Sequence, residues 1–488
     1  NTANGGGGIH CFSGSSPRLE NISIINNAAT GNNGRGGGFR CTTNSDPSLE
    51  NVLISGNTAT QEGGGVFCYN SDPSFVNVTI TGNLSAIADG SGVFLKNNSN
   101  PTLVSTVLWG NASNEIEFAD VDNSSSITIS YSNIEGGQDS IATNENGTVT
   151  WGDGNIDVDP RFVDEENDNY HLLASSQCIN GGDPTTFDSD GSRTDMGTYY
   201  YHNEYSGPTW YITEGGNDTT ATGASDDPFR SIQAGINFSS NTDSVTAAAG
   251  TYVENINFRG RNIEVVGENR ETTIIDGNQN GSVVTFENEE DSTAVLSGFT
   301  IQNGYANFRG GGIYCLNNAS PTLKDLTVNG NGAKNSGAGL WFWFSNARLT
   351  DLIVSNNTVS SGDVSYGGGI SINNSDLILK NVLVVGNEAD YGAGIELYDH
   401  SKPHLNNVTV VGNTAAVAGG GLEMADGNHP TLINSILWDN SPEEIYIHPD
   451  SQSDSVSISY SLVSEGQDSI VTNDNGTVIW GTGNIDVD

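Results

Sequence analysis

The sequence predicts an all-β solenoid, in which short strands stack in parallel along one axis, built as two units in tandem. Three observations predict it. A short glycine-rich unit recurs along the chain, side chains of one kind recur at fixed places in that unit, and no helical period of 3.6 residues appears. A unit of two or three strands cannot bury its own inner face, so each copy must stack on the next.

The repeated unit begins with glycines, continues as a short alternating strand and a polar turn that often contains proline, and ends in a second strand and a turn of the form x-G-N. Alternation bounded by Gly, Asn and Pro is typical of strands joined by tight turns. Successive copies are 25 to 30 residues apart and start at Gly6, Gly36, Gly63 and Gly90, then at Gly310, Gly337, Gly367, Gly392 and Gly419.

An asparagine recurs after the second strand of each copy. Stacking in register places equivalent side chains about 4.8 Å apart. Asparagine tolerates a left-handed backbone and can hydrogen-bond its own copy one coil away, so the column predicts a structural ladder. Its members are Asn27, Asn57, Asn83 and Asn111, then Asn303, Asn331, Asn357, Asn387, Asn413 and Asn440.

The sixth position of each copy is always apolar, so we expect this column to lie inside the solenoid. It holds Cys11, Cys41, Cys68 and Leu95, then Cys315, Phe342, Ile372, Leu397 and Met424. Four of the five cysteines are therefore expected to act as small buried hydrophobes. A disulfide between neighbouring coils would be compatible with the strand spacing.

These repeats resemble the right-handed parallel β-helix proteins that bacteria secrete, the architecture of the pectate-lyase-like superfamily, over nearly the whole chain. Residues 209–258 resemble the capping segment that opens such a solenoid, with a short amphipathic helix over 229–238 whose Ile232 and Ile236 point inward. Residues 157–200 resemble the matching exit segment. Caps are needed because an open solenoid end is an exposed sheet edge.

A longer period divides the chain. Residues 131–159 match 460–488 at an offset of 329, with 21 of 29 positions identical. We therefore predict a first unit over 1–204, the C-terminal part of a β-helix with its exit segment, and a second over 205–488, with its capping segment and without an exit segment. Both ends are expected to cut through a larger repeat, so that the 488 residues are a window on a longer chain.

Composition excludes some partners. The net charge is -43, with 16 Lys and Arg against 59 Asp and Glu. Nucleic acid and anionic membrane surfaces both require basic patches, so neither is expected. No run of about 18 apolar residues occurs, so direct membrane insertion is not expected either. An acidic surface suits solubility in salt, cation binding or a place outside the cell.

The resemblance implies that a polysaccharide lyase or hydrolase site should be sought. Lyases of this kind place Arg or Lys near a calcium ion held by Asp, but the basic residues here are scattered, and Arg259, Arg261 and Arg309 come nearest to a cluster. Hydrolases place carboxylates on adjacent coils. The best candidates of this kind are Glu396 and Glu423, and they are weak ones.

Glu396 and Glu423 occupy the same outward position on neighbouring coils, with Asp399, Asp426, His400 and His429 near them. Stacked carboxylates would be about 5 Å apart, the separation found in retaining glycosidases, and their repulsion would raise one pKa. The first unit has Phe67 and Phe94 there, so the pair is not a shared feature. A divalent cation site and a solvated acidic face stay open as alternatives.

A candidate metal site lies in DSDGSRTDMG, where Asp188, Asp190 and Asp195 could surround an ion, with Gly191 allowing the loop to fold around it. The loop lacks the bidentate glutamate of an EF-hand, so an Asx-rich turn is the alternative. Ca²⁺ is the one cofactor that the sequence suggests, and none is certain.

Outward aromatic residues form the last candidate site. Trp341 and Trp343 lie on one coil, Tyr314 one coil before and Tyr398 two coils after. The first unit has Phe12, Phe67, Tyr69 and Phe94 in the same two columns. Exposed rings on a flat sheet stack on sugars or are covered by another chain, so the stripe predicts a carbohydrate or protein contact.

Two functions remain. The first is a non-enzymatic, extracellular or cell-surface structural or adhesive protein, whose tandem units self-associate with neighbouring copies into a fibre, stalk or sheath. The second is a β-helix protein that binds or cleaves polysaccharide. An enzyme normally needs one site, so two units with different outer faces favour the first and make catalysis the less expected outcome.

Overall fold

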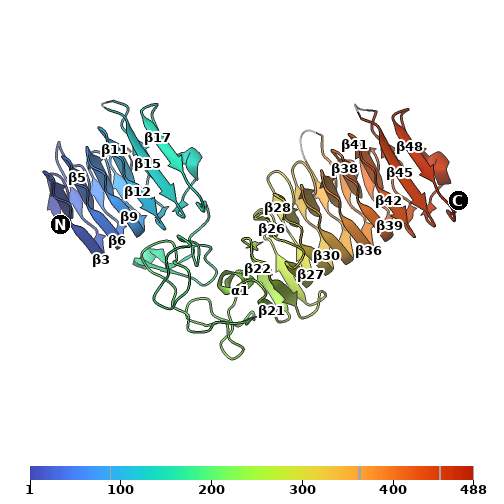
Figure 1. The fold of residues 1–488 in the computed structure, drawn as a ribbon, viewed down its shortest axis with the longest axis horizontal. Coiled ribbons are helices and arrows are strands. Elements are labelled where there is room, and N and C mark those ends of the chain that lie inside the picture. The colour runs from blue at the N-terminus through green and yellow to red at the C-terminus, as the bar shows by residue number, and fades with distance from the viewer. Residues whose placement is uncertain (88–89, 122, 361–363, 450–451, 487–488) are drawn as a thin grey trace. The chain divides into compact units, whose positions relative to one another are not determined.

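In the computed structural model, strands pair in parallel between successive coils, and this confirms the predicted parallel β-helix. The structure describes residues 1–87, 90–121, 123–360, 364–449 and 452–486. The chain divides into two compact units, Asn1–Glu204 and Tyr205–Asp488. Within each unit the sheets run along the stack of coils (Figure 1).

Unit 1 has three parallel sheets and an antiparallel pair. The four-stranded sheet contains β1 (Thr2–Ala3), β4 (Ala28–Ala29), β7 (Thr58–Ala59) and β10 (Leu84–Ser85). The five-stranded sheet contains β2 (Ile9–Phe12), β5 (Phe39–Thr42), β8 (Val66–Tyr69), β11 (Val93–Lys96) and β14 (Ile116–Phe118). The eight-stranded sheet contains β3 (Arg18–Ile25), β6 (Ser48–Ser55), β9 (Ser74–Thr81), β12 (Thr102–Val104), β13 (Val107–Trp109), β15 (Ser125–Ser130), β16 (Asn133–Ile134) and β17 (Gly147–Trp151). The antiparallel pair is β18 (Phe162–Asp164) and β19 (Asn169–Leu172), and short 3-10 turns cover Gln138–Ser140 and Glu165–Asn167.

Unit 2 repeats this plan with longer sheets. The fifteen-stranded sheet contains β20 (Thr209–Ile212), β21 (Ser244–Ala247), β22 (Gly250–Val253), β24 (Glu264–Gly267), β25 (Thr273–Asp276), β27 (Val295–Gln302), β30 (Thr322–Asn329), β33 (Arg348–Ser355), β36 (Ile378–Val385), β39 (His404–Val411), β42 (Thr431–Ile433), β43 (Ile436–Trp438), β45 (Asp454–Ser459), β46 (Leu462–Val463) and β48 (Gly476–Trp480). The nine-stranded sheet contains β23 (Ile256–Asn257), β26 (Val284–Phe286), β29 (Ile313–Cys315), β32 (Leu340–Trp343), β35 (Ile370–Asn373), β38 (Ile395–Tyr398), β41 (Leu422–Ala425), β44 (Ile445–Ile447) and β47 (Ile470–Val471). The five-stranded sheet contains β28 (Tyr305–Ala306), β31 (Gly332–Ala333), β34 (Thr358–Val359), β37 (Glu388–Tyr391) and β40 (Thr414–Ala418), and a 3-10 turn covers Gly466–Ser469.

The glycine that starts each repeat makes the sharp corner before the next strand. Gly392, for example, has a φ of +59°, a conformation that costs residues with a Cβ atom free energy. A Cβ there would also lie 2.9 Å from Glu396 Cβ. The corner therefore requires glycine both for its backbone conformation and for lack of space.

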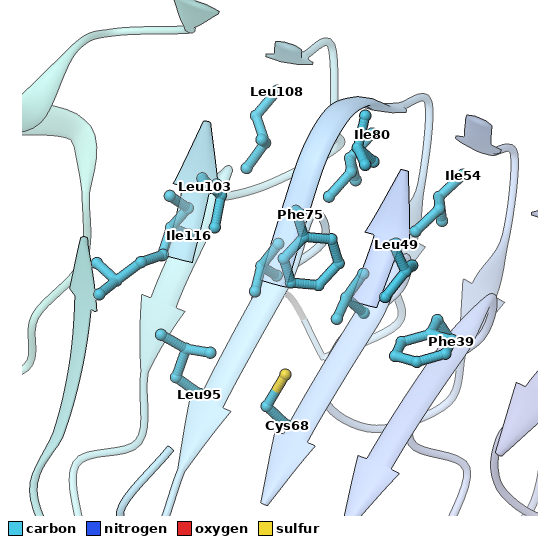
Figure 2. Packing of buried hydrophobic residues seen from close by; sticks show 14 of the residues in the cluster. Phe39, Leu49, Ile54, Cys68, Phe75, Ile80, Leu95, Leu103, Leu108 and Ile116 are labelled. Carbon is cyan, nitrogen blue, oxygen red and sulfur yellow. The ribbon is translucent and has the colours of Figure 1, made fainter. Parts of the chain in front are cut away.

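The core of unit 1 is a thin column of apolar side chains that repeat from coil to coil (Figure 2). In unit 1, Phe39, Leu49, Phe75 and Leu103 are fully buried. The cysteines of the sixth position are also buried, and Cys41 Sγ lies 3.3 Å from Cys68 Sγ, with both thiols free. Inward positions thus stack like on like, as parallel strands in register require.

The asparagine column forms a hydrogen-bonded ladder in both units. The main-chain N–H and the Nδ2 of each asparagine donate to the Oδ1 of the asparagine one coil further along, at 2.8–3.0 Å. A second Nδ2 hydrogen reaches a main-chain carbonyl, as from Asn387 to Val354. The ladder residues are Asn27, Asn57, Asn83 and Asn111, and Asn331, Asn357, Asn387, Asn413 and Asn440.

The place of Asn303 in this ladder was predicted wrongly. Gly304, not Asn303, donates its N–H to Asn331 Oδ1. Asn303 lies one residue earlier with a φ of +55°, and its Nδ2 donates to Asp276. The spacing of repeats alone could not resolve this shift, because asparagine suits the left-handed turn as well as the ladder.

Both ladders end on a glutamate. Glu115 accepts hydrogen bonds from the N–H and the Nδ2 of Asn111, and Glu444 does the same for Asn440. Burial raises the pKa of Glu115 to about 8, although the bonds from Asn111 act in the opposite direction. Burial also raises the pKa of Glu444. The spacing N-x-x-x-E, present in both units, was the signal for these caps.

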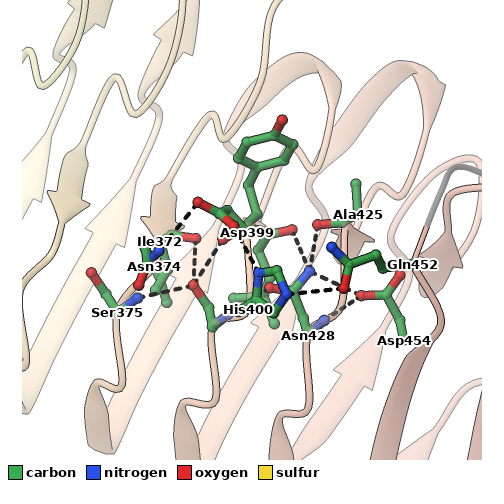
Figure 3. A network of polar contacts seen from close by, with 12 residues as sticks. Ile372, Asn374, Ser375, Asp399, His400, Ala425, Asn428, Gln452 and Asp454 are labelled. Carbon is green, nitrogen blue, oxygen red and sulfur yellow. Dashed lines mark hydrogen bonds and ion pairs between the residues drawn. The ribbon is translucent and has the colours of Figure 1, made fainter.

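A second polar ladder lies in the turn that follows each of the strands β35, β38 and β41 of the nine-stranded sheet (Figure 3). In unit 2 the N–H of Ser375 donates to Ser401 Oγ, and the N–H of Ser401 donates to Asn428 Oδ1. Asn428 in turn donates to Asp454 Oδ1 through its N–H and its Nδ2. The coils that contain β35, β38 and β41 are therefore each held to the next by side chains at two turns.

The capping helix of unit 2 is shorter than predicted. Helix α1 covers Ile232–Phe238, with Ser231 as its N-cap, and Ile232 and Ile236 are buried. Residues 229–231 do not join it, because Phe229 exchanges main-chain hydrogen bonds with Tyr211 and Thr213 of the neighbouring segment. Pairing with the first strand thus replaces the first helical turn.

Replacing Asn387 by Ala should lower the free energy of unfolding of unit 2 by about 3 kcal/mol, because the buried groups of Asn357, Val354 and Asn413 lose a partner. Urea unfolding of the full chain measures this change. The matched control is the exposed Asn406→Ala, expected to change the free energy by less than about 0.5 kcal/mol. Equal effects of the two would contradict a stabilising ladder.

Unit 1 should lose stability as the pH rises. The unfolded state releases the Glu115 proton at its ordinary pKa of 4.5, whereas the folded state keeps it to about 8. Between these values the folded state binds more protons, so the free energy of unfolding falls with pH. Urea unfolding from pH 5 to 8 should show a slope that Glu115→Gln reduces by up to about 1.4 kcal/mol per pH unit.

The control for this pH effect is Glu166→Gln, an exposed glutamate of the same unit that should leave the slope unchanged. A Glu115→Gln slope equal to that of the unchanged protein would show that Glu115 titrates normally.

Candidate functional site

The candidate residues of unit 2 gather on the outer face of the nine-stranded sheet. The second residue of each strand forms one row along the coils, in the register Tyr314, Trp341, Ser371, Glu396, Glu423 and Tyr446. The fourth residue forms a second row with Trp343, Asn373, Tyr398 and Ala425. Strand alternation places both rows outside the core.

The middle of the first row, from Trp341 to Glu423, is buried although it points away from the core. Trp341 is 2% exposed, Glu396 5% and Glu423 2%. The glycine corner folds over these side chains, since a Cβ on Gly367 would lie 3.1 Å from Glu396 Oε2. Trp341 therefore faces outward, as alternation predicts, but its ring is not exposed, because the preceding turn covers this strand position.

Trp341 forms part of a packed aromatic group. Its ring stacks on Tyr314 with 5.0 Å between centroids, and the Arg309 guanidinium lies 5.1 Å from its ring centroid. Such contacts add packing and cation–π stabilisation at a partly desolvated surface. We assign Trp341 and Tyr314 to support of the outer face.

Glu396 and Glu423 are adjacent in register, as the sequence predicts, but Glu396 is held inside a hydroxyl network. Ser336 Oγ lies 2.9 Å from Ser371 Oγ and 3.2 Å from Glu396 Oε2. Burial raises the pKa of Glu396, while bonds from Ser371 and Ser336 and the charge of Arg309 act against it. A carboxyl group enclosed in this way can bridge neighbouring coils through hydrogen bonds. It cannot contact a polysaccharide chain in solution.

The acidic and histidine side chains near this pair have partners of their own. His400 Nδ1 lies 2.7 Å from Asp399 Oδ1, and its Nε2 lies 3.0 Å from Gln452 Oε1 (Figure 3). The hydrogen bond with Asp399 raises the pKa of His400. His429 contacts Ser455 on the next coil. These contacts tie neighbouring turns together.

The second row is exposed and carries rings at alternate coils. Trp343 is 40% and Tyr398 46% exposed, and Asn373 lies between them in register. Two strand spacings separate the rings by about 10 Å along the stack. Phe344 packs against Trp343 with 5.1 Å between centroids. We call Trp343, Phe344, Asn373 and Tyr398 the unit 2 strip.

Unit 1 has the same pattern at the equivalent coils. Phe12, Thr42 and Tyr69 are in register on neighbouring strands, and Phe12 and Tyr69 are exposed. We call these three residues the unit 1 strip. The buried row differs, because Phe67 and Phe94 stack where unit 2 has Glu396 and Glu423. What both units share is an exposed ring, a polar residue and a second exposed ring.

Sequence reasoning singled out Trp343 and Tyr398 but missed Asn373 and Phe344. The strand alternation of the repeat was sufficient to place Asn373 between the two rings. Phe344 has a φ of +49°, which turns it out of the strand, and nothing in its sequence context indicated that.

The loop predicted to hold a metal ion is closed by main-chain hydrogen bonds. Asp195 is buried and accepts N–H bonds from Asn180 and Tyr201, and Asp188 accepts one from Asp195 itself. Burial raises the pKa of Asp195 to about 8 and that of Asp188 to about 6. Asp190 accepts bonds from Ser192 and Asn203. These contacts describe an Asx-rich turn.

Within the described ranges, no group of three or more His, Cys, Asp or Glu side chains is placed to hold a metal ion. The calcium site at Asp188, Asp190 and Asp195 therefore stays a prediction that this geometry does not support. In the same ranges, no helix has both the length and the apolar character needed to cross a bilayer.

Comparison with known proteins adds the following. No family model matches the sequence, and no curated protein matches it. Among solved structures, the chain is similar to a mutant pectin methylesterase in complex with hexasaccharide IV, at 11% identity and a TM-score of 0.29, covering 52% of this chain and 78% of the other. It is also similar to pectin methylesterase in complex with hexasaccharide VII, at 11% identity and a TM-score of 0.25, covering 57% and 80%. Likeness at this level does not indicate a shared activity.

Proposed function

We propose that the protein binds a polysaccharide along the unit 1 and unit 2 strips and does not cleave it. The observation that carries this proposal is the exposed ring, polar residue and second ring at equivalent coils of both units. Aromatic faces stack on sugar rings, and in unit 2 the half-buried Asn373 amide between the rings can hydrogen-bond sugar hydroxyls, whereas Thr42 of unit 1 is buried against His10. The separation of the rings, about 10 Å, is comparable with the length of a disaccharide.

The charge of the protein selects the kind of polysaccharide. A net charge of -43 repels uronic acid polymers at moderate ionic strength. Asp399 follows Tyr398 directly, so a carboxylate lies at the edge of the unit 2 strip. A neutral polymer meets no such repulsion and is the ligand class we propose.

Binding without cleavage follows from the burial of the acidic pair. A glycosidase acid must contact the glycosidic oxygen, and a hydrolase needs a second carboxylate within reach of the sugar. Glu396 and Glu423 are the stacked pair, and both lie beneath the glycine corners. The rings of the strips, by contrast, are open to solvent.

Trp343→Ala and Tyr398→Ala should each weaken binding of a neutral polysaccharide about tenfold, because each removes one stacked sugar, worth about 1–1.5 kcal/mol. Affinity electrophoresis of the full chain in gels containing cellulose derivatives, xylan, glucan or polygalacturonate measures this. The protein is expected to be retarded in gels that contain a neutral polymer and not in gels that contain polygalacturonate. Incubation with the protein should not shorten any of the polymers.

The matched control is Tyr460→Ala, which removes a ring that is 61% exposed in the bend after β45, away from the strips, and should leave retardation unchanged. Phe12→Ala and Tyr69→Ala test the unit 1 strip in the same gels. Retardation that survives the loss of all four rings, or shortening of the polymer that Glu396→Gln abolishes, would contradict the proposal.

A second candidate is a structural or adhesive role at the cell surface, in which copies of the chain assemble into a fibre, stalk or sheath. It is supported by the repetition of one building plan, since both units carry an asparagine ladder that ends on a glutamate. Stacked coils of this kind suit an elongated support. A wall-bound or sheath-forming array could also present the strips to polysaccharide.

If the chain assembles, sedimentation velocity of the full protein should show mass that increases with concentration, and micrographs should show fibres with an axial repeat. A monomer at every concentration, with dispersed particles in micrographs, would argue against assembly while leaving polysaccharide binding intact. The two proposals can therefore fail independently.

A further inference from the structure

In unit 1, the exit segment crosses the outer face of the eight-stranded sheet. Thr198 makes the central contact: its N–H donates to Thr79 Oγ1, and its hydroxyl accepts from the Thr79 N–H and donates to the Val52 carbonyl, at 2.7–3.0 Å. The N–H of Gly197 donates to the Ser105 carbonyl, and that of Asp183 to Ser105 Oγ. The segment thus binds strand positions that point away from the core.

These contacts bury outward side chains. Val107 is fully buried, and Leu53 and Thr79 nearly so. The approach at Gly197 is close, since a Cβ there would lie 2.8 Å from Thr79 Oγ1 and 3.2 Å from Val107 Cγ2. With a φ of +101°, Gly197 also adopts a conformation that other residues avoid. Further along, the Arg193 guanidinium lies 5.7 Å from the Tyr131 ring centroid.

The equivalent face of unit 2 has the same design. Residues 102–111 and 431–440 read TLVSTVLWGN and TLINSILWDN, so Ile436 stands where unit 1 has Val107, and Asn434 where it has Ser105. Ser105 and Asn434 both have a φ just above +50°. Tyr460 corresponds to Tyr131 at the 329-residue offset.

The hydrogen-bonding position is also repeated. Thr409 follows Asn407 as Thr79 follows Asn77, and both asparagines have a positive φ. Thr409 pairs in register with Ile436, as Thr79 pairs with Val107. The receptor for a residue like Thr198 is therefore present in unit 2.

What differs is the exposure. Ile436 is 41% exposed, whereas Val107 is fully buried, and Tyr460 is among the most exposed large side chains of the described part of the chain. Ile433, on the strand before Ile436, is exposed as well. We call Thr409, Ile433, Asn434, Ile436 and Tyr460 the Ile436 face.

We propose that the Ile436 face binds an exit segment of the kind that residues 178–198 form in unit 1, supplied by a repeat of the same type. The apolar part of the face would take the Gly-Thr pair equivalent to Gly197 and Thr198, with hydrogen bonds to Thr409. The ring of Tyr460 would take an arginine in the place of Arg193. The occupant is thus an extended, glycine-containing peptide with one basic residue.

A synthetic peptide of residues 176–201, fluorescently labelled and kept reduced, tests this by anisotropy titration with the full chain. Saturable binding is expected with one site per chain, because unit 1 already holds its own segment. Ile436→Asp should weaken binding at least about tenfold, since a carboxylate would be buried against the peptide. Circular dichroism should show that the variant keeps its fold, as expected for an exposed position.

Two matched controls accompany the titration. Val417→Asp, at an exposed apolar position on another sheet, should bind the peptide as the unchanged chain does. A peptide carrying Gly197→Val should not bind, because its side chain meets the sheet at the closest point of contact.

Absence of saturable binding, or equal binding to the Ile436→Asp chain, would overturn the proposal. So would dimerisation of the full chain that Ile436→Asp abolishes in sedimentation velocity, because the face would then belong to a second copy. This test does not involve the strips, so its outcome is independent of polysaccharide binding.

Discussion

The coils between Asn27 and Glu115 and between Asn331 and Glu444 depend on the asparagine ladder, because it fixes the register in which their other columns stack. A buried asparagine can satisfy its amide only if the next coil presents an oxygen at one place, so a slipped coil would leave buried donors without acceptors. Asn357 and Asn387 show the arrangement, each accepting from the coil before and donating to the coil after. The apolar core then fills the space that this register defines.

Most of the architecture could be predicted because the same residue pattern recurs in many copies of the repeat. One apolar residue at a given position is weak evidence, but the same position apolar in nine copies indicates a core column. Features that occur once were harder: the shift from Asn303 to Gly304 and the lost first turn of α1 both depend on a local contact. The glutamate caps were visible in the sequence, yet their role required the geometry of the ladder end.

The candidate site shows the same limit. Strand alternation correctly placed Trp341 and Trp343 on the outer face, but it cannot tell which outward position a neighbouring turn covers. The glycine corners cover the row of Trp341 and leave that of Trp343 open. The two tryptophans therefore differ in role. Trp341 packs beneath the turn and supports the outer face of the sheet, whereas Trp343 is exposed and can contact a ligand. The conformation of the turns therefore decides which outward side chains of a β-helix are exposed, and so which of them can bind a ligand.

The glutamate at each ladder end has a consequence for how such proteins change in length over generations. The bonds from asparagine to asparagine all run in one direction along a ladder, so an inner asparagine accepts from the coil before it and donates to the coil after it. A duplicated coil inserted within a ladder, before Glu115 or Glu444, would meet the same asparagine partners as the original coil. Gaining or losing a coil therefore requires no new ladder contact. The length of the solenoid can change by duplication of a coil alone.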